Sequence, residues 1–305
     1  MMHPIYLSFS EDQFRSHFAQ VKKGGECSDS SEKHIRYYKN SLANYVDCPQ
    51  GKERKGTTLS HIRKPCQVEK DEKFWTASCL MTVFHSNNRI KEFVQLFKNA
   101  YGEKPPIAGI NNWYDCLNGE LHLYFETNLP SPVQYKKWLR KNLHKQQFIP
   151  YILYSDNGKK NLEGPTNVDA ILLNENNGFS VIIESKVLSD ISCHITYDVM
   201  RNQIARNIDV MLDRNDALCP PLNHRDPEKT LFLLLTPQLF KDNPQSRLYG
   251  YKMNEYMTKP DSLQFDIPQR TECNWNGISK RLGWLTWKDF RETNNNCCNW
   301  LKDEG

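Results

Sequence analysis

The chain has 305 residues, of which 38% are hydrophobic and 25% charged, and its formal net charge is +4. This apolar content suffices for one large domain or two modest ones, which excludes a disordered tail or a linker. The weakly basic balance permits a polyanionic partner but falls short of the charge that would demand one.

No apolar run reaches the roughly 18 residues of a membrane-spanning helix, and the stretch MMHPIYLSFSEDQF lacks the order of a signal peptide. We therefore expect a soluble protein without membrane contact, located in the cytoplasm, or in the nucleus of a eukaryote. The ten cysteines are irregularly spaced, and we expect most of them to be reduced and buried. A zinc site of Cys27, Cys48, His61 and Cys66 is an alternative that the spacing disfavours, because structural zinc ligands usually come in close pairs.

Residues 1–110 are expected to form a mainly helical, loop-rich N-terminal region that serves substrate recognition or assembly. Within it, residues 20–73 are polar, with mixed charges and little periodicity, which is typical of loops. Apolar residues then recur at three- and four-residue spacing, which predicts helices over 74–84 and 89–101, the second closed by Gly102.

Residues 111–305 are expected to form an α/β domain. A third helix is predicted within 113–126 and a fourth over 133–144, where Ser131 would be the N-cap and Pro132 the first helical residue.

From residue 148 the apolar period changes from that of a helix to that of a strand. The predicted strands are FIPYILYS (148–155), NVDAILLN (167–174) and FSVIIESK (179–186). The Asn177-Gly178 dipeptide between the last two is a strong hairpin signal. A helix over 197–212 and a buried strand over 230–237 follow, so the predicted order is helix, three strands, helix, strand.

The aromatic-rich stretch WNGISKRLGWLTWKDF near the end of the chain is expected to pack against the sheet. Trp284 and Trp287 supply the large apolar surfaces, and Thr286 is predicted to cap a short helix that begins at Trp287.

Three charged residues interrupt the apolar strands of the predicted hairpin. Glu184 and Lys186 are two residues apart, so their side chains project from the same face of one strand, and Asp169 lies near the same end of the partner strand. Carboxylates buried together raise each other's pKa, and a divalent cation that prefers oxygen ligands, Mg²⁺ or Mn²⁺, removes that cost. The pattern indicates metal-dependent hydrolysis of a phosphodiester, with the lysine stabilising charge on the phosphate or activating the water.

Asp169 and the run Glu184-Ser185-Lys186, on two hairpin strands followed by a helix that carries Gln203, resemble the motif of the PD-(D/E)XK nuclease superfamily. The resemblance covers about residues 135–237 and implies a restriction-endonuclease-like αβββαβ core with a mixed central sheet. It also implies a nuclease that requires Mg²⁺ or Mn²⁺ and acts on DNA in preference to RNA, in restriction, defence or repair. A homodimer is compatible with the sequence.

The same resemblance implies roles for individual residues. Asp169, Glu184 and the backbone carbonyl of Ser185 would bind the metal, and Lys186 would be the catalytic lysine. Val168 stands where the name of the superfamily has a proline, a position that often differs among its members.

The helix after the hairpin places Gln203, Arg206 and Asn207 on its polar side. By the resemblance, Gln203 orients Lys186 or the attacking water, and Arg206 and Asn207 contact the nucleic acid. For Arg206, an ion pair with Asp209 is the alternative.

Many members of the superfamily use a further acidic residue upstream of the aspartate. Glu126 and Glu163 are the candidates, and their spacing does not choose between them.

The three-residue pattern alone is unspecific, because Glu53-Arg54-Lys55 and Asp71-Glu72-Lys73 also match it. Neither has an apolar strand around it, so both are expected to be solvated surface. A structural ion pair at residues 184–186 is one alternative to catalysis. The other is a noncatalytic protein that binds nucleic acid or serves in assembly, because the fold does not ensure the activity.

Overall fold

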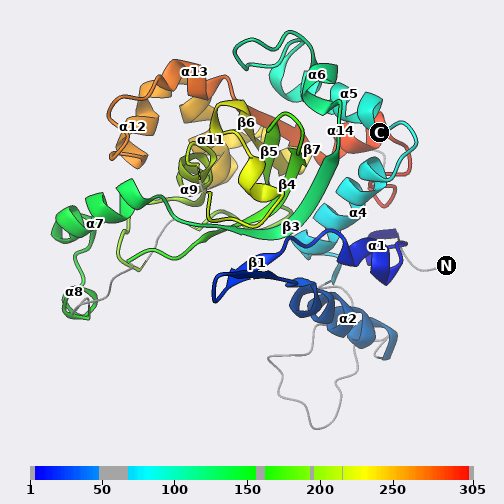
Figure 1. Cartoon of the computed structure of the whole chain (residues 1–305), viewed down its shortest axis with the longest axis horizontal. Helices are drawn as coiled ribbons and strands as arrows, with labels where there is room; N and C mark the ends of the chain where they lie inside the picture. The colour runs from blue at the N-terminus through cyan, green and yellow to red at the C-terminus, as the bar shows by residue number, and fades with distance from the viewer. Residues whose placement is uncertain (1–3, 48–67, 156–161, 193–195, 215, 302–305) are drawn as a thin grey trace.

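The computed structural model describes residues 4–47, 68–155, 162–192, 196–214 and 216–301. Its centre is a five-stranded sheet of order β3-β4-β5-β6-β7 (Figure 1). The strands are β3 (Leu121–Leu129), β4 (Thr166–Asn174), β5 (Ser180–Ser185), β6 (Thr230–Thr236) and β7 (Leu282–Thr286). The β3-β4 and β4-β5 pairs are antiparallel and the β5-β6 and β6-β7 pairs are parallel. The predicted α/β class and mixed sheet are therefore confirmed.

The predicted hairpin of β4 and β5 turns at Gly178. This residue has φ +76°, a left-handed conformation that favours glycine, and its N–H donates to the Asn174 carbonyl at 3.0 Å. A Cβ at this position would approach the His224 carbonyl oxygen to 2.9 Å, so the close approach also requires glycine. The turn sets a register in which Ala170 faces Ile183.

Helices cover both faces of the sheet, which makes three layers (Figure 1). On one face lie α4 (Glu72–Phe84), α5 (Arg89–Tyr101), α6 (Trp113–Leu117) and α14 (Trp287–Thr293), with α1 (Glu11–Arg15) and α2 (Ser31–Asp47) beside them. On the other lie α9 (Gln203–Met211), α10 (Gln238–Asp242), α11 (Leu248–Thr258), α12 (Leu263–Asp266) and α13 (Trp275–Ser279). Alternation along β5 sends Val181 and Ile183 to the first face and Ile182 to the second.

The remaining elements are short or peripheral. They are β1 (Val21–Lys23), β2 (Glu26–Ser28), α7 (Val133–Gln146), α8 (Pro150–Tyr154) and the 3₁₀ helices η1 (Pro4–Tyr6), η3 (Leu222–His224), η4 (Pro227–Lys229), η5 (Pro244–Ser246) and η6 (Pro260–Ser262). None of the helices described here is long and apolar enough to cross a membrane.

The helices predicted over 74–84 and 89–101 are confirmed as α4 and α5, and the strand predicted over 230–237 is confirmed as β6. The C-terminal packing is also confirmed: Trp284 and Trp287 are buried, and Thr286 caps α14 in a capping box with Asp289. One apolar cluster joins the helices of the N-terminal region to the strands of the sheet, so the core continues across residue 110.

Two elements were predicted in the wrong state. The helix expected within 113–126 ends at Leu117, and Leu121–Leu129 is the edge strand β3. Eight paired positions with β4 stabilise the extended conformation of this segment. The strand expected over 148–155 is instead the short helix α8, in which Pro150 supplies the first turn and no residue is buried.

Three boundaries also differ from the predictions. The helix predicted over 197–212 begins only at Gln203, because the Asn202 side chain accepts a hydrogen bond from the Ala205 N–H and caps it. Pro132, not Ser131, is the N-cap of α7. Part of the expected loop at 20–73 is the helix α2, whose residues Ile35 and Tyr38 join the core.

Cysteines form two disulfides, Cys27–Cys219 and Cys79–Cys298, so the expected reduced state is wrong for these four residues. It holds for Cys116, Cys273 and Cys297, of which the first and last are buried. The disulfide removes Cys27 from the alternative zinc site, and Cys48, His61 and Cys66 lie outside the described residues.

Candidate functional site

Three carboxylates lie at one level of the sheet, on three neighbouring strands. Beyond the paired residues Ala170 and Ile183, the register places Asp169 of β4 opposite Glu184 of β5. On the other side of β4, the pairing of Phe125 with Ala170 places Glu126 of β3 opposite Asp169. The convergence that was predicted for Asp169 and Glu184 is therefore present, and Glu126 extends it.

Glu184 is fully buried and accepts hydrogen bonds on both carboxylate oxygens. Oε1 accepts from the Lys186 ammonium and from Gln203 Nε2, the latter at 2.6 Å. Oε2 accepts from Asn207 Nδ2 at 2.7 Å. Because both amides come from the first two turns of α9, this helix sets the orientation of the carboxylate.

Lys186 holds its ammonium among oxygen atoms. Nζ lies 3.2 Å from the Ser185 carbonyl oxygen and 3.7 Å from Glu72 Oε2, besides its bond to Glu184. Burial alone would lower the pKa of Lys186, but the surrounding carboxylates outweigh it and raise the pKa above the ordinary value. The lysine therefore remains a cation, and its backbone is fixed by the Trp287 indole, which donates to the Lys186 carbonyl at 3.0 Å.

Asp169 is in the opposite electrostatic situation. Burial and then the charge of Glu184 raise the pKa of its carboxyl well above the usual range, although Lys186 and a hydrogen bond act against this. That bond comes from the Ser185 N–H, which donates to Asp169 Oδ2 at 2.8 Å. The second oxygen, Oδ1, has no hydrogen bond to any of the described residues.

Glu72 belongs to the site and was missed by the sequence analysis. It lies in the first turn of α4, and its Oε1 accepts from the Val187 N–H at 3.3 Å and from the Ser189 hydroxyl. The prediction that residues 71–73 are solvated surface is wrong, because Lys73 also reaches Glu126 Oε2 at 2.5 Å. The N-cap residue Asp71 followed by an apolar helix was a usable signal that this run begins a packed element.

The polar residues of α9 divide into two groups. Gln203 and Asn207 both bind Glu184, and Asn207 is fully buried, so the predicted contact of Asn207 with nucleic acid is wrong. Arg206 Nε lies 3.1 Å from Glu163 Oε1, and Arg206 Nη2 donates to the Pro165 carbonyl at 3.3 Å. Arg206 therefore forms its ion pair with Glu163, and the alternative pairing with Asp209 is wrong.

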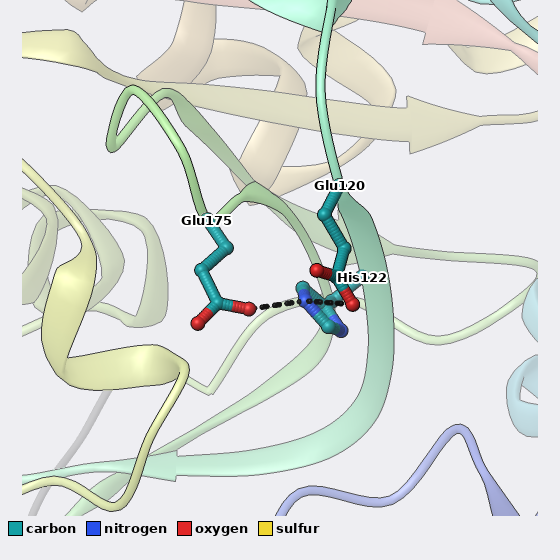
Figure 2. A group of neighbouring side chains, drawn as sticks. All are labelled: Glu120, His122 and Glu175. Carbon is teal, nitrogen blue, oxygen red and sulfur yellow. Dashed lines mark hydrogen bonds and ion pairs between the residues drawn. The ribbon is translucent and has the colours of Figure 1, made fainter.

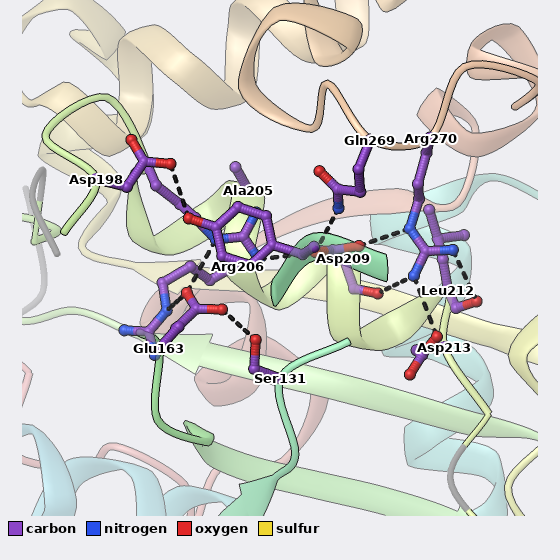
Figure 3. Close-up of polar contacts among 12 residues, drawn as sticks. Ser131, Glu163, Asp198, Ala205, Arg206, Asp209, Leu212, Asp213, Gln269 and Arg270 are labelled. Atoms are coloured by element: carbon purple, nitrogen blue, oxygen red, sulfur yellow. Dashed lines mark hydrogen bonds and ion pairs between the residues drawn. The ribbon is translucent and has the colours of Figure 1, made fainter. Parts of the chain in front are cut away.

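Glu163 belongs to a buried ion network behind α9, and not to the row of carboxylates (Figure 3). Its Oε1 accepts from Arg201 Nε at 2.9 Å, and Arg201 in turn pairs with Asp209 at 2.7 Å. Arg270 completes the network, 2.6 Å from the other oxygen of Asp209. Of the two upstream candidates, Glu126 therefore lies in the row and Glu163 does not.

The donor set fits a divalent cation. When Asp169, Glu184, Glu72 and Glu126 are all ionised, they outnumber the two ammonium groups of Lys186 and Lys73 by two charges. The Lys186 ammonium is surrounded by carboxylate and carbonyl oxygens, which are the ligand types of hard cations such as Mg²⁺. Asp169, Glu184 and the Ser185 carbonyl are thus able to hold such an ion.

A second group of ligand-type side chains lies toward the other end of β3 (Figure 2). One oxygen or nitrogen of each of Glu120, His122 and Glu175 lies within 4.8 Å of the others. His122 Nε2 is 2.8 Å from Glu175 Oε2 and 3.8 Å from Glu120 Oε1. The hydrogen bond between His122 and Glu175 accounts for this arrangement without a metal, and the imidazole makes the donor set unlike the all-oxygen set that suits Mg²⁺.

The chain was also compared with known proteins. No family model, no curated protein and no solved structure matches it.

Proposed function

We propose that the protein is a divalent-metal-dependent nuclease that hydrolyses phosphodiester bonds in DNA. The observation that carries the proposal is that Asp169 and Glu184 follow the paired residues Ala170 and Ile183 on two neighbouring strands, with the Lys186 ammonium bound to the same Glu184. A buried carboxylate and a buried lysine beside the half-buried Asp169 are costly, and phosphodiester chemistry would explain why they occur together.

The order of elements supports this proposal. The helices α5 and α6 precede the antiparallel strands β3, β4 and β5, and α9 then leads to β6, which is parallel to β5. The αβββαβ order that the resemblance to the PD-(D/E)XK superfamily implies fits these elements when β3 takes the place of the strand expected over 148–155 and α6, α7 and α8 count as additional helices.

The carboxylates of the site would bind the metal ion. Asp169, Glu184 and the Ser185 carbonyl would hold the ion, and Glu72 and Glu126 are close enough to add negative charge around it. A bound Mg²⁺ or Mn²⁺ would neutralise charge on the phosphate and lower the pKa of a water molecule.

Lys186 would act on the phosphate or on the attacking water. The Lys186 ammonium, which donates to Glu184 Oε1 in this structure, would donate to a phosphate oxygen, where negative charge develops. Gln203 and Asn207 would keep Glu184 in place by donating to its two oxygens, so both are positioning residues.

The second candidate is a noncatalytic protein that binds nucleic acid on the same scaffold. The ion pair of Lys186 with Glu184 favours it, because a structural ion pair requires no metal. The two candidates differ in whether the lysine is needed for a reaction.

The test is cleavage of plasmid DNA and of a labelled single strand in Mg²⁺, in Mn²⁺ and in EDTA. We expect cleavage in either metal, none in EDTA, and a rate for Lys186→Met about a hundredfold or more below wild type, with Mn²⁺ binding retained. Methionine keeps the apolar stem, so a folded variant separates charge from packing. A folded Lys186→Met that cuts at the wild-type rate refutes the catalytic role, and a wild-type protein inert on every DNA and RNA tested favours the scaffold.

A further inference from the structure

A cleft of about 750 Å³ opens beside the β3 edge of the sheet. Its walls are the β1-β2 hairpin, α2, the second half of β3 and the segment around Cys219, and Figure 1 shows β1 and α2 next to that edge. The four basic residues that line it are Lys22, Lys23, Lys33 and Arg36, all of them exposed.

The charges in this cleft are unequally compensated. Its acidic residues are paired within the protein, since Glu32 and Asp29 lie 3.3 Å and 4.0 Å from the Arg15 guanidinium. Glu126, at the inner end, is paired with Lys73 at 2.5 Å.

The four basic side chains, in contrast, have no acidic partner within the described ranges. With Arg15 and Lys73 included, six basic groups face the three carboxylates of the cleft, so an excess of three positive charges remains for a polyanion to neutralise.

Glu126 connects the cleft with the candidate active site. Glu126 lines the cleft and lies opposite Asp169, which faces Glu184 in turn. A smaller pocket of about 290 Å³ shares Lys33 and Glu126 with the cleft and reaches Asn167, two residues before Asp169 on β4. A chain of phosphates in the cleft would thus have one end at the row of carboxylates.

The outer wall is held in place covalently. Lys22 is paired with Cys27 in the β1-β2 hairpin, and the disulfide from Cys27 ties this hairpin to Cys219 on the opposite side of the cleft. A hairpin of two three-residue strands has little stability of its own, so this link keeps its lysines at the cleft.

We infer that this cleft binds the phosphate backbone of the nucleic acid and guides it to Asp169, an inference that rests on the proposed function. Lysine and arginine contacts to phosphates give binding without base recognition and with a strong salt dependence. The cleft accordingly contributes affinity for the nucleic acid and guides its backbone toward Asp169, and it does not by itself select a base sequence.

The test uses the full chain carrying Lys186→Met, in EDTA, so that binding is measured without cleavage. A quadruple variant replaces Lys22, Lys23, Lys33 and Arg36 by alanine. Its control replaces four exposed lysines outside the cleft, Lys91, Lys104, Lys137 and Lys280, and so makes the same change in net charge. Fluorescence anisotropy with a labelled single strand and the corresponding duplex is recorded over a series of salt concentrations.

We expect the plot of log affinity against log salt to become shallower by roughly 3 for the single strand and roughly 4 for the duplex in the cleft variant. The control should change this slope by less than about 1. Equal slopes in the two variants would overturn the inference even if the wild type cleaves DNA. A slope change confined to the cleft variant, together with a wild type that cleaves no DNA or RNA in Mg²⁺ or Mn²⁺, would support the cleft and reject the nuclease.

Discussion

Asp169 carries a carboxyl whose ionisation the fold opposes. Burial and the charge of Glu184 raise its pKa well above the usual range in the folded protein, whereas the unfolded chain has the ordinary value near 3.9. The stability that this group contributes is therefore fully present below the unfolded pKa and is lost as the pH rises through the raised folded value. At neutral pH and without metal, the site reduces the free energy of unfolding.

We predict that Asp169→Asn raises the Tm at neutral pH in EDTA by about 2 °C or more, because the amide cannot ionise beside Glu184. The gain should shrink as the pH falls and disappear well below the unfolded value of about 3.9, where the wild-type carboxyl is protonated in both states. Saturating Mn²⁺ should raise the Tm of the wild type and not of the variant.

Thermal unfolding followed by circular dichroism at several pH values checks this prediction, with Asp261→Asn, a change at an exposed position, as the control. A Tm difference that does not depend on pH would show that the carboxyl at 169 ionises freely.

At the scale of the element, α9 connects the site to the network behind it. Gln203 and Asn207 bind Glu184 from one side of the helix, and Asp209 binds Arg201 and Arg270 from the other. The network thus anchors the helix that orients the candidate metal ligand.

We predict that Asp209→Ala lowers the free energy of unfolding by about 3–5 kcal/mol, because it leaves the buried Arg201 and the partly buried Arg270 without their shared carboxylate. The matched control is Asp216→Ala, whose pair with Arg214 has side chains 78% and 70% exposed and should be worth about 1 kcal/mol or less. Urea denaturation compares the two variants. Similar losses would mean that the buried network does not stabilise α9 more than a surface pair does.

At the scale of the whole molecule, two disulfides join segments that are far apart in sequence. Cys79 of α4 is bonded to Cys298 near the end of the chain, 219 residues away, and α4 carries Glu72 into the site. The C-terminal segment is thereby tied to a helix that supplies part of the site.

We predict that replacing Cys79 and Cys298 together by serine lowers the free energy of unfolding by about 2–5 kcal/mol in a non-reducing buffer. Cys273→Ser, a change at a free and partly exposed thiol, should alter it much less. Alkylation of the unfolded, unreduced protein followed by mass spectrometry should leave Cys27, Cys79, Cys219 and Cys298 unlabelled. Labelling of all four would contradict both bonds.

The sequence by itself determined the local parts of the site. The Asn-Gly turn and the two apolar runs predict the β4-β5 hairpin, and the two-residue period of a strand places Glu184 and Lys186 on one face, with Asp169 at the same level. These features depend on neighbours in the chain, and so short-range patterns reveal them. The amphipathic helix α5 was predictable for the same reason.

Only the tertiary structure decided the rest, because those features depend on contacts between distant segments. Pairing with β4 fixes Leu121–Leu129 as a strand although the run directly follows the helix α6, and packing of α4 against the sheet brings Glu72 within reach of Lys186. The burial of Asn207 follows from its bond to Glu184 on another element. The free energy of these long-range contacts outweighs the intrinsic helix or strand propensity of each segment. The spacing of residues within one segment therefore does not predict them.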